Sequence, residues 1–71
     1  MRLKVDLESD ALYFRISEDK ILESEELAPG IIVDFAENDK VVGVEILGLK
    51  ERFSLSELGE IKVELPTVAK D

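Results

Sequence analysis

The sequence contains no cysteine, no histidine and no tryptophan. Without cysteine the chain cannot form a disulfide, and without cysteine or histidine it lacks the usual ligands of a structural zinc ion. An enzyme of this composition would have to use a serine with a lysine, or a pair of acids. The serines all fit turns, strands or a helix cap, so we expect no catalytic residue, no cofactor and no metal. Because a domain of 71 residues has a thin core and these crosslinks are missing, we expect a homodimer.

Basic residues are also scarce: 9 stand against 17 acidic residues, which gives a net charge of −8. Such a charge repels the phosphates of nucleic acids and of anionic lipids. The longest apolar run, from Ala11 to Phe14, is far too short for a membrane span or a signal-peptide core. We therefore expect a cytoplasmic protein that binds neither nucleic acid nor membrane. The lack of glutamine beside abundant glutamate, lysine, isoleucine and valine is also typical of thermophile proteins.

Apolar residues make up 45% of the chain, which excludes intrinsic disorder, and their spacing predicts β-strands. In the first fifteen or so residues they alternate with polar residues on both sides of "ESDA" at 8–11, the pattern of a hairpin. The predicted cross-strand pairs are Leu3 with Ile16, Val5 with Phe14 and Leu7 with Leu12. This register places all six on one face, whereas a shift by one residue would bury charged residues instead.

A second hairpin is predicted around Asn38 and Asp39, two residues that tolerate the positive φ angles of a tight turn. Its predicted pairs are Ile31 with Ile46, Val33 with Val44, Phe35 with Val42 and Glu37 with Lys40. The first three pairs make one wholly apolar face. The opposite face is mixed, with acids among apolar residues, which suggests that something covers part of it.

The remaining segments carry weaker patterns. Residues 20–30, "KILESEELAPG", predict an acidic edge strand followed by a turn at Pro29 and Gly30. Ser54 and Glu57 form a capping-box pattern, which predicts at most one short helical turn near residues 54–59. Residues 61–65 predict a last short strand.

Together these segments predict a mainly-β domain, an antiparallel meander of about five or six short strands over residues 1–66 with a frayed tail at 67–71. No long amphipathic helix is present to cover the sheet. The apolar face therefore requires either a curled, barrel-like sheet or a sheet packed on another sheet, from the same chain or from a second copy.

The segments "DALYFRIS" at 10–17, "PGIIVDF" at 29–35 and "VVGVEIL" at 41–47 follow one another in this order. Over residues 3–53 the chain resembles the small prokaryotic family known as domain of unknown function 2283. Its turn "AENDK" departs from the glycine-containing turn expected of that family, which affects only the turn geometry. The resemblance implies a stand-alone cytosolic protein without an assigned activity, whose relatives are sometimes proposed as antitoxins of toxin–antitoxin pairs. It transfers no catalytic residue.

The strongest functional hypothesis is a surface for a protein partner. On the mixed face of the second hairpin, acids stand among apolar residues. The outward face of the second strand, in the first hairpin, adds a tyrosine and an arginine, both typical of binding hot spots. An ordinary solvent face, with Arg15 paired to Asp6 or to a glutamate, is the competing interpretation. The candidate partner surface consists of Tyr13, Arg15, Ile32, Asp34, Val41, Glu45 and Leu47. Combined with the resemblance, these residues favour an interaction module, and its most concrete form is the antitoxin-like partner of a small basic toxin.

Two other functions remain as alternatives. Asp6, Glu8 and Asp10 are spaced by two residues, so a turn could gather their carboxylates around a divalent cation, although the glycine and downstream glutamate of an EF-hand loop are missing. A solvated acidic rim explains the same three residues equally well. An unrecognised enzyme is the second alternative.

Overall fold

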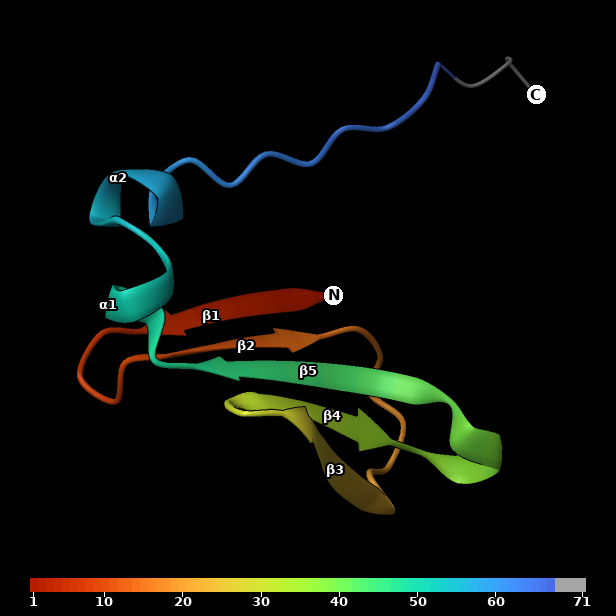
Figure 1. Ribbon diagram of the computed structural model, residues 1–71. Helices are drawn as coiled ribbons and strands as arrows, with labels where there is room; N and C mark the ends of the chain where they lie inside the picture. The colour runs from red at the N-terminus through yellow and green to blue at the C-terminus, as the bar shows by residue number, and fades with distance from the viewer. Residues whose placement is uncertain (68–71) are drawn as a thin grey trace.

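The computed structural model describes residues 1–67, and these form one open antiparallel sheet of five strands with two short helices and a 3₁₀ turn (Figure 1). The elements in chain order are β1 (Arg2–Asp6), β2 (Ala11–Arg15), β3 (Glu23–Ala28), β4 (Ile31–Phe35), η1 (Glu37–Asp39), β5 (Val41–Leu47), α1 (Leu49–Arg52) and α2 (Leu55–Leu58). Of the tail predicted at 67–71, Thr67 is exposed and residues 68–71 lie outside the described residues.

The predicted mainly-β fold class is confirmed. Both predicted hairpins are present as β1–β2 and β4–β5, and the acidic segment between them is β3, an edge strand. The spatial order is β1-β2-β5-β4-β3, so β5 lies between the two earlier strands β2 and β4 rather than following them at the edge. This order places β5 at the centre of the sheet, where it pairs with β2 on one side and with β4 on the other.

The register predicted for the first hairpin is wrong by two residues. Leu3 pairs with Phe14 and Val5 with Leu12. The cause is the loop: the Asp6 carboxylate accepts hydrogen bonds from the backbone N–H groups of Glu8 and Ser9, at 3.0 and 3.3 Å, and so ends the strand early. A shift by two keeps every side chain on its predicted face. Leu7 is lost from the strand and is 49% exposed in the loop.

The register predicted for the second hairpin is confirmed at Ile31–Ile46 and Val33–Val44. It is wrong at the turn, where a bulge pairs Phe35 with Val41. Asn38 and Asp39 adopt φ angles of 61° and 57°, as the turn prediction requires.

The predicted ion pair between Glu37 and Lys40 does not form. Lys40 Nζ instead lies 2.5 Å from the Asp19 carboxylate, on the segment that follows β2. The lysine therefore ties the η1 turn to the connection between β2 and β3.

The predicted helical turn near residues 54–59 is confirmed as α2, and both hydrogen bonds of its Ser54–Glu57 capping box are present. The preceding helix α1 was not predicted. Leu49, its first residue, is fully buried, and its backbone N–H donates to the carbonyl of Asp10 at 3.2 Å. The β1–β2 loop thus holds the start of α1 and anchors it to the sheet.

The core of residues 1–67 is small. Its buried apolar residues are Ala11, Val33, Ala36, Val42 and Leu49. On the apolar face of the sheet, most of the other strand residues are only half-buried, because no helix covers that face along its length. Each α-helix of the described chain is a single turn, so none there could cross a membrane.

The predicted last strand at 61–65 is not a strand in this structure. After α2 the chain continues to residue 67 without regular structure, and Ile61, Val63 and Leu65 are 50%, 83% and 81% exposed. Figure 1 shows this blue segment running out from α2, separate from the sheet in that view.

Candidate functional site

The strand register brings five of the predicted surface residues together on one side of the sheet, which we call the polar face. Tyr13 on β2 and Ile32 on β4 both pair with Glu45 on the central strand β5, while Arg15 and Asp34 both pair with Gly43. The polar face consists of Tyr13, Arg15, Ile32, Asp34 and Glu45. All five are partly accessible to solvent.

Asp34 is the centre of this face. Its Oδ2 accepts a hydrogen bond of 2.7 Å from the Tyr13 hydroxyl, and its Oδ1 accepts one of 2.6 Å from the Ser24 hydroxyl on β3. The carboxylate therefore links its own strand, β4, with the neighbouring β3 and, across the central β5, with β2. Sequence reasoning did not single out Ser24, because only the pairing of β3 with β4 places it opposite Asp34.

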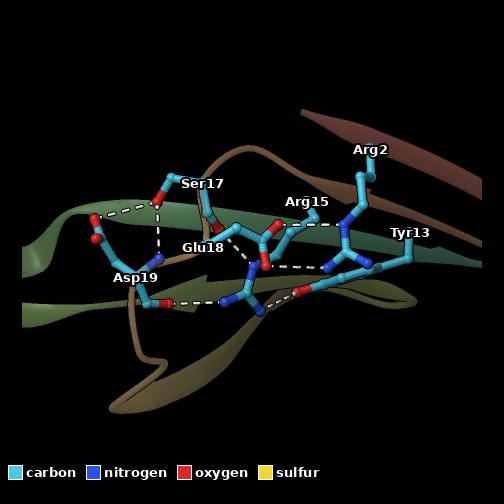
Figure 2. A network of polar contacts seen from close by, with 6 residues as sticks. All are labelled: Arg2, Tyr13, Arg15, Ser17, Glu18 and Asp19. Carbon is cyan, nitrogen blue, oxygen red and sulfur yellow. Dashed lines mark hydrogen bonds and ion pairs between the residues drawn. The ribbon is translucent and has the colours of Figure 1, made fainter.

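Arg15 extends the network from Tyr13 to the chain that leaves β2 (Figure 2). Its Nη1 donates weakly to the Tyr13 hydroxyl at 3.4 Å, while Nε and Nη2 donate to the carbonyls of Ser17 and Asp19 at 2.5 and 2.7 Å. The suggested pairing of Arg15 with Asp6 or a glutamate is wrong. The glutamate in the same view, Glu18, pairs instead with Arg2.

The surroundings of Tyr13 and Arg15 keep both side chains protonated near neutral pH. Partial burial, together with the hydrogen bond to Asp34, raises the pKa of the Tyr13 hydroxyl. The hydrogen bond to the Tyr13 oxygen raises the pKa of the Arg15 guanidinium. Near neutral pH the polar face therefore presents a neutral phenol beside a cation, and the phenol is held by a carboxylate.

Gly43 makes room for this arrangement. A Cβ atom at this position would collide with the Tyr13 hydroxyl and would approach the Asp34 carboxylate to 3.0 Å. Only glycine lets both side chains lie across the central strand. The sequence carries a signal for this close approach, namely a glycine inside a strand that is rich in β-branched residues.

The remaining two candidates lie at the two ends of β5 and flank the five residues of the polar face. Val41 pairs with Phe35 beside the bulge, and Leu47 pairs with Ala11 at the other end of β5. They are 40% and 36% exposed. The structure thus places the seven predicted residues as one central group of five and two flanking apolar residues.

The acids considered for a cation do not form a cluster. Asp6 accepts hydrogen bonds within its own loop, and its pKa is lowered chiefly by the backbone N–H of Ser9. The Asp10 carboxylate accepts from the backbone N–H of Lys50 at 3.0 Å, which supports α1. Within residues 1–67 no three acidic side chains gather as a group that could hold a metal ion.

Two shallow hollows lie near these groups. One of about 260 Å³ lies between Asp6 on the first loop and Tyr13 and Glu45 on the polar face. The other, of about 450 Å³, lies beside the ion pair of Asp19 and Lys40. A guanidinium, a phenol and carboxylates presented together on one side of a sheet suit hydrogen bonding to the surface of another protein.

Comparison with known families adds one finding. The family model described as a protein of unknown function, DUF2283, matches residues 2–50 of the 71-residue chain. The match covers all five strands and the start of α1. No curated protein and no solved structure matches the chain significantly.

Proposed function

The chain belongs to the DUF2283 family, and within that family of unknown function we propose that it is a cytoplasmic protein–protein interaction module. The proposed partner is a small basic protein. It binds along the exposed edge formed by β3 and onto the adjacent polar face.

The observation that carries this proposal is the edge strand β3. All six of its residues, Glu23–Ala28, are exposed, and only one of its two sides is paired, with β4. A free strand edge offers backbone N–H and C=O groups to an incoming strand, which is a common mode of peptide recognition.

The charges on this strand select the partner. Glu23 and Glu25 pair with Phe35 and Val33 on β4, so they stand on the otherwise apolar face of the sheet. Inward-facing charges of this kind discourage pairing with another apolar strand. A strand that carries lysine or arginine at alternate positions would neutralise them and would also be attracted by the net charge of −8.

The polar face supplies the second part of the contact. Tyr13 and Arg15 are residue types that are enriched at interfaces, and the hydrogen bond from its hydroxyl to Asp34 holds the tyrosine in one orientation before a partner arrives. We also propose that the protein is a homodimer and that it binds neither nucleic acid nor membranes. Its antitoxin-like form, in which the basic partner is a small toxin, comes from the family resemblance.

A charge-reversal experiment tests the proposal. Immobilised wild-type protein is compared with the double variant Glu23→Lys/Glu25→Lys for retention of basic proteins from the cytosol of the source organism, identified by mass spectrometry. The control, Glu8→Lys/Glu51→Lys, makes the same change in net charge at other exposed positions. We expect a basic protein that the wild type and the control retain and the β3 variant loses.

The recovered protein is then purified and titrated against the same three variants at low and high salt. Affinity that falls with salt and with reversal of the β3 charges supports the proposal. Equal loss in both double variants would mean that only the net charge matters. Retention of nucleic acid or vesicles in place of a protein would contradict the proposal.

A further inference from the structure

The C-terminal segment, residues 60–67, has the pattern of a strand but no strand beside it. Ile61, Val63 and Leu65 alternate with Glu60, Lys62 and Glu64, and all six are exposed. A segment with one apolar side is stable in water only when that side is covered. The Cα radius of gyration of 14.4 Å also exceeds the value of about 11 Å expected for a compact chain of this length.

The sheet has two free edges, and they differ in chemistry. The β3 edge carries Glu23 and Glu25 on its apolar side. The β1 edge carries Leu3 and Val5 on that side, and Leu3 is 41% exposed. An alternating apolar strand therefore fits the β1 edge and is repelled by the β3 edge.

One antiparallel register of residues 61–65 against β1 gives favourable side-chain pairs on both faces of the sheet. Leu65 lies opposite Leu3 and Val63 opposite Val5, which brings apolar residues together on one face, and Ile61 lies just beyond the end of β1. In the same register Glu64 lies opposite Lys4 and Lys62 opposite Asp6 on the other face. A shift of two residues, with Lys62 opposite Lys4, places like charges together.

We propose that residues 61–65 of one copy add to the β1 edge of a second copy, and that the exchange is reciprocal. Within its own chain the segment follows α2 without forming a strand, and residues 61–65 make no backbone hydrogen bond to the rest of the described chain. Two exchanged strands related by a twofold axis form a closed dimer in which the β1 edge of each copy is covered. The inference specifies how the proposed homodimer is held together and is independent of the basic partner.

A charge exchange tests the register. Light scattering and analytical ultracentrifugation of the full chain are expected to show a dimer at micromolar concentration. Lys4→Glu and Glu64→Lys should each raise the dimer dissociation constant by about tenfold or more, and the double variant should restore it. The control pair Lys50→Glu and Glu51→Lys, on α1, should change nothing. A dimer that none of these variants weakens would overturn the inference in favour of sheet-face packing.

The absence of cysteine allows a second test that identifies the partner strand. Leu3→Cys and Leu65→Cys are made in separate proteins, mixed and oxidised gently. We expect the mixed disulfide dimer to form faster than either self-linked dimer, because only the mixed pair lies opposite.

A chain that carries both cysteines shows whether the strand beside β1 comes from the same copy or from the second copy. A product of dimer mass supports exchange, whereas a product that remains monomeric in mass would place the segment on its own β1 edge and overturn the proposal. The variant Val63→Pro, which removes a backbone donor in an exposed segment, should be folded by circular dichroism and monomeric by light scattering. We expect Val63→Pro to retain the basic partner, whereas the β3 charge variants lose it. This comparison tests the proposed dimer separately from the proposed basic partner.

Discussion

Replacing Tyr13 with phenylalanine tests whether the Asp34 network contributes to stability. The variant removes one hydroxyl and leaves the ring in place, so it deletes the 2.7 Å hydrogen bond to Asp34 and the weak one from Arg15. A hydrogen bond to a charged group contributes about 1.5 to 3 kcal/mol when buried. Since Asp34 is half-buried and keeps Ser24, we expect a loss of about 1 to 2 kcal/mol. This is a large part of the roughly 4 to 11 kcal/mol available to a domain of this size.

The assay is urea unfolding followed by far-UV circular dichroism, because the variant lacks the only tyrosine. A double-mutant cycle with Asp34→Ala should give a coupling free energy near 1 kcal/mol. Glu45→Ala, at a neighbouring position of the same face, is the control and should change stability by no more than about 0.5 kcal/mol. A coupling of zero, or an equal loss for Glu45→Ala, would refute a specific role for the network.

The single tyrosine also makes the network visible in the wild type. Absorbance at 295 nm reports Tyr13 alone, and its midpoint should lie above that of the urea-unfolded chain, because partial burial and Asp34 raise its pKa. A group whose pKa is raised on folding contributes stability below its unfolded pKa of about 10 and loses it as the pH rises through the folded value. We therefore expect the difference in stability between wild type and Tyr13→Phe to shrink in strong alkali. An unchanged difference would contradict the assigned hydrogen bond.

Three further predictions concern the fold. Leu49→Ala should cost about 3 to 5 kcal/mol, because this side chain is fully buried, whereas Leu55→Ala, at a position 67% exposed, should cost less than about 1 kcal/mol; thermal melts compare them. Gly43→Ala should cost about 1 to 3 kcal/mol and lower the Tyr13 midpoint at 295 nm, since the new methyl group displaces the hydroxyl. Asp19→Asn should be slightly less stable than wild type at pH 7, and the difference should vanish as the pH falls through the folded-state pKa of Asp19, which Lys40 holds below its ordinary value, because this stability is lost on protonation. An Asp19→Asn deficit that persists in acid, or equal losses for the two leucines, would contradict these assignments.

The sequence predicted the faces of the strands better than it predicted their neighbours. Alternation determines which side chains share a face, and an error of two residues in the first hairpin left that result unchanged. Alternation does not say which hairpins lie side by side, so the central position of β5 could not be predicted. The helix α1 was missed because its stability comes from the burial of Leu49 and its contact with Asp10, not from a local helical pattern.

The candidate site shows the same limit. The outward positions of Tyr13, Arg15 and Asp34 followed from strand parity, but their interpretation as free side chains for a partner was incomplete, because Asp34 is held by two hydroxyls. One of those hydroxyls belongs to Ser24, on the strand whose own pattern was the weakest in the sequence. Side-chain pairs across non-sequential strands depend on the sheet order, which a single sequence does not encode locally.

The two free edges of the sheet connect these observations with the proposed function. An open sheet of five strands must protect or use both edges, and this chain treats them differently. Glutamates that face the apolar side make β3 unsuitable for a strand like residues 61–65 but suitable for a basic one. Leu3 and Val5 make β1 suitable for the apolar segment that the same chain leaves exposed. If each edge selects its own partner, dimerisation and recognition use separate surfaces, and a variant at one edge should leave binding at the other intact.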